Sequence, residues 1–235
     1  MDPVKAYVPL QDEYATKTIE NFLSDDELDL FWSYIDHPET IHEVDNCMRD
    51  AWPEFEHECT AHYHIFSNFN TSTSYEPLRN ILLPKIKEHF GDTLKLPHIH
   101  ILRSRFPYGL HNDANQSAEG LDNPLPAWTL IIPFETVNSK TYVFDQRSDY
   151  KSPEAWIYHT DPPQFENPAV DKETYERDFA PFTSDWIMHY LTVESVFEWK
   201  RGSCFAADRY KYHASDNYFN HGLQGKDAII IWTAE

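Results

Sequence analysis

Residues 103–113 read RSRFPYGLHND and join the end of an expected strand to a pair of potential metal ligands. Pro107 ends the strand, Gly109 permits a turn, and His111 and Asp113 follow two residues apart. In extended backbone, residues i and i+2 point to the same side, so an imidazole and a carboxylate can converge there on one ion. Two ligands hold a metal only loosely, and a third is expected from elsewhere in the chain.

A segment near the C-terminus is the expected source of the third ligand. Residues 200–208 read KRGSCFAAD, a turn followed by a short apolar strand, and His213 lies shortly beyond them. Two histidines and one carboxylate on one face of a metal leave neighbouring coordination positions open, as non-haem Fe(II) oxygenases require. The predicted metal ligands are therefore His111, Asp113 and His213.

A second His-x-Asp motif, His159-Thr160-Asp161, is an alternative source of two ligands. It lies nearer to His213 along the chain than His111 does. The context favours His111, which follows a strand and a Gly turn and precedes two further expected strands, whereas Asp161 is followed directly by two prolines. Replacement of His111 and Asp113 by His159 and Asp161 stays open at this point.

The bulk composition is that of a globular protein and excludes several classes of partner. The chain has 235 residues, of which 41% are hydrophobic and 15% aromatic, and a formal net charge of −20. Such a charge repels nucleic acids and anionic membranes. No apolar run approaches the roughly 20 residues that cross a bilayer. Three unclustered cysteines and a polar N-terminus favour the cytoplasm: Cys47, Cys59 and Cys204.

Two helices are expected in the N-terminal third. Residues 24–27 read SDDE, a capping box that predicts a helix running through Asp36. A second helix is predicted from about Tyr75 to Phe90, with Gly91 as its C-terminal cap. Two His-x-His pairs, His62 with His64 and His98 with His100, are expected to be ordinary residues on a sheet surface, because Cys59 has no second cysteine at zinc-site spacing. The alternative for His100 is a place in the lining of a substrate pocket.

Strands dominate the rest of the chain. Short segments bounded by Pro, Gly, Asn or Asp and rich in β-branched or aromatic residues predict six strands: 99–106, 128–134, 140–145, 195–199, 203–207 and 227–233. Helices followed by strands predict a mostly β domain, a sandwich or squashed barrel with helices on one side. We expect one domain over residues 1–235, with residues 150–192 as an insertion or lid within it.

Taken in order, these segments resemble the Fe(II)/2-oxoglutarate-dependent oxygenases of the prolyl-hydroxylase-like or phytanoyl-hydroxylase-like kind. The matching pieces are the opening strand and helix (19–27), the proximal metal motif (111–113), a core strand (141–144), the turn, strand and distal histidine (202–217), and the last strand with its basic residue (226–232). The resemblance implies a double-stranded β-helix (jelly-roll) core preceded by N-terminal helices.

The resemblance also implies a reaction. Fe(II), 2-oxoglutarate and O₂ would act together to hydroxylate a small-molecule, amino-acid or peptidyl substrate, with release of succinate and CO₂. Relatives that halogenate generally lack the carboxylate ligand, so Asp113 favours hydroxylation. The alternatives are desaturation, halogenation, or a non-catalytic jelly roll that keeps the metal for binding or assembly. Neither the substrate nor the oligomeric state can be deduced.

Lys226 is the residue that the resemblance assigns to the cosubstrate. A buried cation offsets the cost of desolvating the distal carboxylate of 2-oxoglutarate. The interval from His213 to Lys226 is slightly longer than is common in the family, so Arg103, Arg105 or Arg209 could take this role. Phe106 stands where relatives often have a tyrosine, and Thr129 could supply the missing hydrogen bond. The predicted cosubstrate residues are Lys226, Thr129 and Arg105.

Overall fold

The computed structural model describes residues 15–45, 60–64, 69–91, 95–113, 128–147 and 168–234. Its strands are β1 (Lys17–Ile19), β2 (Ile41–Asp45), β3 (Thr60–His64), β4 (Lys95–Ser104), β5 (Trp128–Pro133), β6 (Lys140–Arg147), β7 (Val193–Glu198), β8 (Cys204–Asp208), β9 (Lys211–Ser215) and β10 (Lys226–Ala234). Its α-helices are α1 (Asp25–Ser33), α3 (Glu76–Phe90) and α5 (Lys172–Asp178), and its 3₁₀ helices are η2 (Tyr34–Asp36), η4 (Thr73–Tyr75), η5 (Asp185–Tyr190) and η6 (Tyr218–His221).

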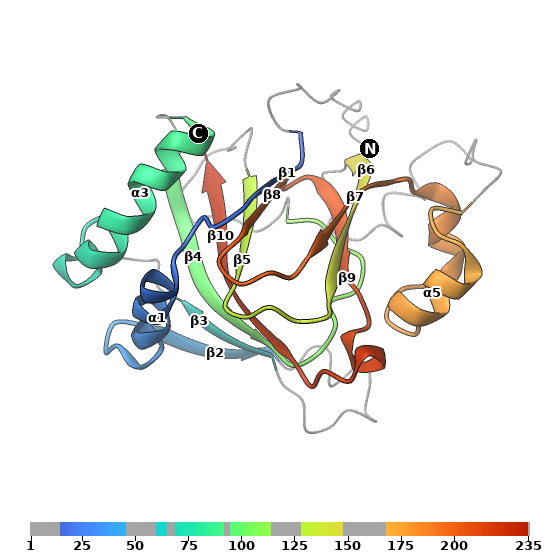
Figure 1. Cartoon of the computed structure of the whole chain (residues 1–235), viewed down its shortest axis with the longest axis horizontal. Coiled ribbons are helices and arrows are strands. Elements are labelled where there is room, and N and C mark those ends of the chain that lie inside the picture. The colour runs from blue at the N-terminus through green and yellow to red at the C-terminus, as the bar shows by residue number, and fades with distance from the viewer. Residues whose placement is uncertain are drawn as a thin grey trace, which may run out of the picture.

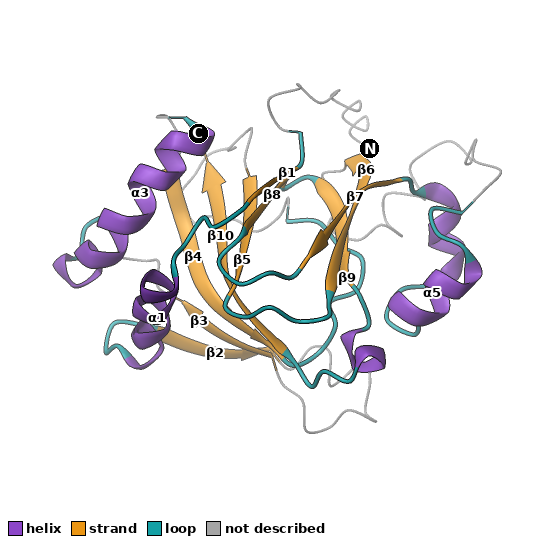
Figure 2. Cartoon of the chain, viewed as in Figure 1, coloured by secondary structure: helices purple, strands orange, loops and turns teal. Residues whose placement is uncertain are grey.

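The strands form two antiparallel sheets that face each other (Figure 1). The larger sheet has seven strands in the order β1-β8-β5-β10-β4-β3-β2, and the smaller has three in the order β7-β6-β9. Figure 2 shows α1 and α3 beside the larger sheet and α5 beside the smaller one. The predicted mostly β, jelly-roll architecture with N-terminal helices is confirmed, but α5 lies beside the second sheet, so the helices are not confined to one side as predicted.

The core has three layers, and β5 takes part in two of them. All six of its residues are buried. Leu130 and Ile132 pack toward the helices, together with Leu82 of α3, while Ile131 faces the space between the sheets. A strand covered on both faces is hydrophobic throughout instead of alternating, which explains why this segment was recognisable as a buried strand.

Both predicted helices are present with the predicted caps. The Ser24 hydroxyl accepts a hydrogen bond from the Glu27 amide at 3.3 Å, and the Glu27 carboxylate accepts one from the Ser24 amide at 2.7 Å. The second helix, α3, ends at Gly91, whose φ of +96° lies in a region that glycine tolerates best. The capping interactions were local and could therefore be predicted from neighbouring residues.

The six predicted strands are all present, with bounds shifted by a few residues. Strands β1 and β3 lie where the resemblance implied an opening strand and where the pair His62 and His64 implied a sheet. Strands β2 and β9 were not predicted, and β9 carries His213. Its sequence, KYHAS, alternates, with Tyr212 and Ala214 facing the third core layer, but five residues with only two apolar side chains give a weak local signal, and the strand conformation depends on pairing with β6. Hydrogen bonds and packing from distant segments override the weak local preference.

The predicted insertion at residues 150–192 is only partly described, because residues 150–167 lie outside the described ranges. The sequence suggested an irregular segment, but the described part contains the helices α5 and η5. Phe179, Ile187 and Met188 are buried in a third core layer against Tyr142 and Phe144 of β6. This part of the segment therefore covers the smaller sheet. Among the described residues, no helix has the length and apolar character needed to span a membrane.

The packing of α3 gives a first prediction. Leu82 is fully buried, whereas the next residue, Leu83, is 40% exposed. We expect Leu82→Ala to lower the free energy of unfolding by about 2–5 kcal/mol, because it leaves a cavity in the core. Leu83→Ala is the matched control and should change the free energy far less. Urea denaturation monitored by circular dichroism measures both, and equal losses would contradict the assigned burial.

Candidate metal centre

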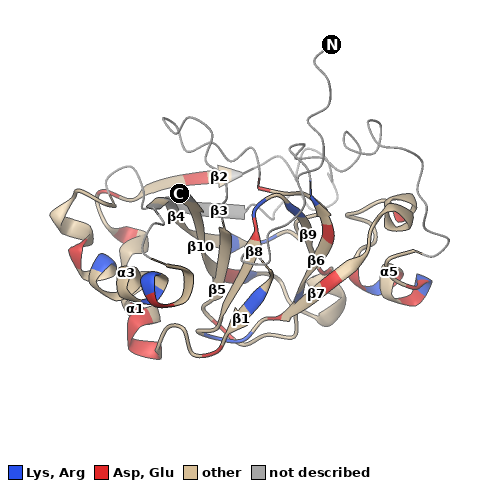
Figure 3. Cartoon of the chain, turned by 90° about the horizontal axis from the view of Figure 1, so that it is seen from above, with Lys and Arg blue, Asp and Glu red and all other residues tan. Residues whose placement is uncertain are grey.

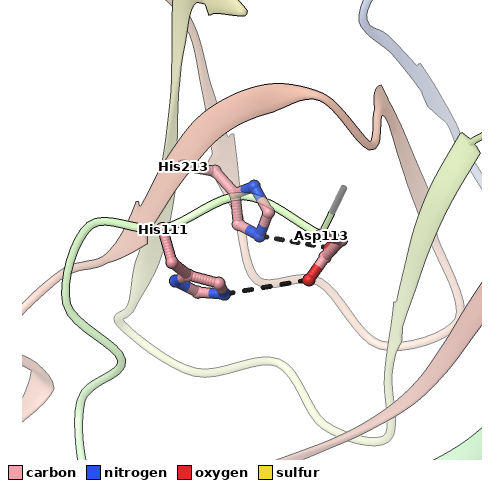
Figure 4. A group of neighbouring side chains, drawn as sticks. All are labelled: His111, Asp113 and His213. Carbon is pink, nitrogen blue, oxygen red and sulfur yellow. Dashed lines mark ion pairs between the residues drawn. The ribbon is translucent and has the colours of Figure 1, made fainter. Parts of the chain in front are cut away.

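His111, Asp113 and His213 come together in the folded chain. One ligand atom from each lies within 4.8 Å of the others, and Figure 4 shows both imidazoles turned toward the carboxylate. His111 Nε2 lies 4.0 Å from Asp113 Oδ1, and His213 Nε2 lies 3.5 Å from Asp113 Oδ2. The three residues predicted as metal ligands thus converge on one point.

Backbone pairing brings the two histidines together. The His111 amide donates to the His213 carbonyl at 3.0 Å, and the His213 amide donates to the His111 carbonyl at 2.8 Å. This isolated antiparallel bridge adds His111 to the free edge of β9. Side chains of directly paired residues project to the same side, and the two ring centroids are 4.5 Å apart.

Each imidazole is oriented by a carbonyl on its far side. The Nδ1 of His111 lies 2.7 Å from the Gly109 carbonyl oxygen, and the Nδ1 of His213 lies 3.1 Å from that of Lys211. Because a carbonyl only accepts hydrogen bonds, Nδ1 carries a proton in both rings, and Nε2 is the nitrogen turned toward Asp113. Metal-binding histidines usually have such a partner, which fixes the tautomer and the ring plane.

Asp113 is buried and is held by two neighbours. The Thr129 hydroxyl donates to Oδ2 at 2.7 Å. The Arg209 guanidinium donates to the Asp113 carbonyl through Nε at 3.1 Å and Nη2 at 2.9 Å, while the Asp113 amide donates to the Arg209 carbonyl at 2.9 Å. Burial alone would raise the pKa of Asp113, but His213, His111, Thr129 and Arg209 together hold this pKa below its ordinary value. The carboxylate is therefore anionic at neutral pH.

The donor set fits a divalent transition metal. Two imidazole nitrogens and one carboxylate oxygen suit Fe(II), with positions left over for further ligands. Within the described ranges, these residues form the one cluster of three or more His, Cys, Asp or Glu side chains able to hold a metal. The alternative ligands His159 and Asp161 lie outside those ranges.

The cluster faces the space between the sheets. His213 is the cross-strand partner of Val143, which is buried in the layer between them. Thr129 lies two residues from Ile131, on the same face of β5, and Ile131 belongs to the same layer. The candidate metal centre thus lies inside the double-stranded β-helix.

Lys226 lies in the same interior. It shares a face of β10 with Ala228 and Ile230, and its side chain is 3% exposed. Its ammonium donates to the Ser139 hydroxyl at 2.8 Å and lies 4.0 Å from the centre of the Trp199 ring. Although the chain is strongly acidic, Figure 3 shows Lys and Arg on strands of both sheets.

A buried carboxylate already faces this ammonium. Asp216 Oδ1 lies 3.7 Å from Lys226 Nζ. Burial lowers the pKa of Lys226 to about 7, and Asp216 acts in the opposite direction. Asp216 follows His213 by three residues, directly after the end of β9, so the ammonium lies beyond the end of the strand that carries this metal ligand.

The other predicted cosubstrate residues lie elsewhere. Arg105 binds Asp227 at 2.8 Å, and Asp227 is adjacent to Lys226 on β10, so it points to the opposite face. This position does not support a cosubstrate role for Arg105. Thr129 contacts Asp113 and so positions a metal ligand. Arg209, considered only as a substitute for Lys226, holds the backbone of Asp113.

Several residues around the candidate metal centre were not predicted from the sequence. Asp216 and Ser139 had no predicted role, although Asp216 lies close to His213 in the sequence HASDN. An acidic residue shortly after a candidate ligand, near a buried strand, was the available signal. The expectation of a surface position is wrong for His100, which is 2% exposed and packs edge-on against Trp232 with ring centroids 5.0 Å apart.

The contact between Thr129 and Asp113 gives a prediction for metal affinity. Thr129→Val keeps the shape of the side chain but removes the donor to the carboxylate, so we expect the affinity for Co(II) or Fe(II) to fall about tenfold. Thr141→Val is the matched control, since Thr141 is equally buried but accepts a hydrogen bond from Trp199 instead. Anaerobic titration monitored by absorbance measures both. An equal loss in the two variants would contradict the role of Thr129.

The lowered pKa of Lys226 predicts a pH dependence of stability. Between pH 7 and about 10, the unfolded chain binds a proton at this lysine that the native protein lacks. The free energy of unfolding should therefore rise with pH across this window in the wild type, relative to Lys226→Met. Lys200→Met is the control, because Lys200 is 56% exposed at the surface. Parallel pH profiles for the wild type and Lys226→Met in urea denaturation would contradict the assignment.

Comparisons with known proteins agree with this architecture. No family model and no curated protein matches the sequence. Among solved structures, the epimerase SnoN, crystallised with Fe³⁺, α-ketoglutarate and nogalamycin RO, is 12% identical with a TM-score of 0.52, over 95% of this chain and 80% of SnoN. The α-ketoglutarate-dependent carbocyclase SnoK from nogalamycin biosynthesis is 13% identical with a TM-score of 0.52. This match covers 95% of this chain and 80% of SnoK.

A third similar structure is an oxidoreductase of the 2OG-Fe(II) oxygenase family from Burkholderia pseudomallei. It is 10% identical with a TM-score of 0.51, and the match covers 94% of this chain and 85% of that protein. At such low identities, the matches are evidence for the fold alone. Across nearly its whole length, the chain has the double-stranded β-helix fold of the Fe(II)/2-oxoglutarate-dependent oxygenases.

Proposed function

We propose that this protein is an Fe(II)- and 2-oxoglutarate-dependent oxygenase that hydroxylates a small-molecule, amino-acid or peptidyl substrate and releases succinate and CO₂. The observation that carries the proposal is the convergence of His111, Asp113 and His213 inside this fold. The Nε2 atoms of both histidines and the anionic carboxylate already face one another. To bind one divalent ion, these ligand atoms, which lie within 4.8 Å of one another, would draw closer together.

His111, Asp113 and His213 would hold Fe(II). When bound, Fe(II) in such a site supplies the activation of O₂ that is coupled to oxidative decarboxylation of 2-oxoglutarate. The protein's part is to fix the ligands and to exclude water. Thr129 and Arg209 hold Asp113 from two directions, and the ligands themselves are largely buried.

Lys226 is the proposed partner of the distal carboxylate of 2-oxoglutarate. Its ammonium lies in the same interior as the metal ligands and is shielded from solvent, so an ion pair formed there would be little screened. The polar contacts of the ammonium with Ser139 and Asp216 keep it at a fixed position. A dicarboxylate could then be oriented at both of its ends.

Hydroxylation is proposed over other outcomes because Asp113 occupies the position of a carboxylate ligand. SnoN and SnoK, which share the fold, are described as an epimerase and a carbocyclase. The fold therefore serves several oxidative outcomes, and the products formed will distinguish them. Both of those proteins come from nogalamycin biosynthesis, which supports a small-molecule substrate for this protein.

A turnover assay tests the proposed function. We expect the protein with Fe(II), 2-oxoglutarate and O₂ to release succinate in proportion to the 2-oxoglutarate consumed, even without a known substrate, at a slow uncoupled rate. Asp113→Ala should lower this rate to background because it removes a metal ligand, whereas Asp145→Ala, at an exposed position on β6, should not. Nuclear magnetic resonance of the reaction mixture quantifies succinate. Metal binding without binding of 2-oxoglutarate would instead favour a non-catalytic jelly roll.

A further inference from the structure

The carboxylate of Asp216 lies deep inside the protein beside the ammonium of Lys226. Asp216 is fully buried and accepts hydrogen bonds from the Ser139 hydroxyl at 2.6 Å and the Lys140 amide at 2.8 Å. Its Oδ1 lies 3.7 Å from Lys226 Nζ, and its Oδ2 lies 3.5 Å from Nε2 of His221. These contacts hold an anion at one fixed position next to the lysine.

Within the described part of the chain, the other close neighbours of the ammonium are two aromatic rings and a hydroxyl, which carry no formal charge. The Trp199 ring centre is 4.0 Å from Nζ, the Tyr218 ring centre is 5.2 Å away, and Ser139 accepts one hydrogen bond. Aromatic faces stabilise a cation but do not neutralise it. When Lys226 is protonated, it and Asp216 therefore already form a buried pair with no net charge.

A ligand carboxylate that reaches Lys226 would be the second anion beside one cation. Two carboxylates in a poorly solvated site repel each other strongly, because water cannot screen them. A 2-oxo acid whose tail ends in a methyl group would not experience this repulsion. The site beside Lys226 would thus distinguish the two kinds of ligand through one side chain, that of Asp216.

We propose that Asp216 competes with the distal carboxylate of the cosubstrate for Lys226 and thereby sets the preference between charged-tail and neutral-tail 2-oxo acids. This inference rests on the proposed function. Asp216 is a specificity-determining residue that weakens the binding of 2-oxoglutarate. Loss of its charge also removes a group that favours protonation of Lys226, but the ligand's own carboxylate then takes over that effect at the same place.

The substitution Asp216→Asn isolates the charge. Asparagine has the same shape, and its carbonyl oxygen can still accept from the Lys140 amide or the Ser139 hydroxyl. A merely structural role for Asp216 would make the variant bind all 2-oxo acids less well. Competition for Lys226 instead predicts a change that depends on the ligand's distal charge.

Calorimetric titration of the Mn(II)-loaded protein with 2-oxoglutarate and with 2-oxopentanoate, which lacks the distal carboxylate, tests the proposal. We expect Asp216→Asn to bind 2-oxoglutarate at least about tenfold more tightly than the wild type does, with the affinity for 2-oxopentanoate changed less than twofold. Asp227→Asn is the matched control, because Asp227 is the next residue after Lys226 but binds Arg105 on the opposite face of β10. It should alter neither affinity.

Weaker binding of 2-oxoglutarate by Asp216→Asn, or an equal shift for both ligands, would overturn the competition. If the wild type and the variant bind 2-oxoglutarate equally well, the inference fails while the proposed function stands. If the metal-loaded proteins bind neither 2-oxo acid, the proposed function fails and the inference fails with it. Should circular dichroism show that Asp216→Asn does not fold, Asp216→Ser, with a smaller neutral side chain, is judged by the same criteria.

Discussion

The candidate metal centre depends on two backbone hydrogen bonds between residues that are far apart in sequence. The reciprocal pairing of His111 with His213 attaches the segment after β4 to the edge of β9. It places both imidazoles on one side, and the carbonyls of Gly109 and Lys211 then set their tautomers. Asp113, two residues further on, is brought to the same point. Together with the hydrogen bonds between Asp113 and Arg209, this bridge gives the two halves of the candidate metal centre a common frame.

Charge inside the double-stranded β-helix is balanced locally, despite the net charge of −20 for the whole chain. Asp113 lies among two histidines and Arg209, and Lys226 lies against Asp216. Each arrangement offsets the cost of removing an ion from water. Their chemical consequences differ, because the anionic side chain at Asp113 is available to a metal, whereas the cation at Lys226 is already matched by a carboxylate.

The sequence allowed prediction of features that depend on near neighbours or on a continuous apolar pattern. The capping box at Ser24 and the buried strand β5 are examples. The convergence of His111, Asp113 and His213 could be anticipated because the order of motifs resembled a known family. Strand β9 could not be anticipated from the sequence, since KYHAS becomes a strand through its pairing with β6. The meeting of Asp216 with Lys226 was also hidden, because it depends on how a strand end packs against the start of β10.

The bridge between His111 and His213 uses main-chain atoms that every residue except proline possesses. Neighbouring side chains can therefore be exchanged over evolutionary time without altering how the two strands approach each other. The chain is only 10–13% identical to solved structures that match it over about 95% of its length, so the same fold is reached with largely different side chains.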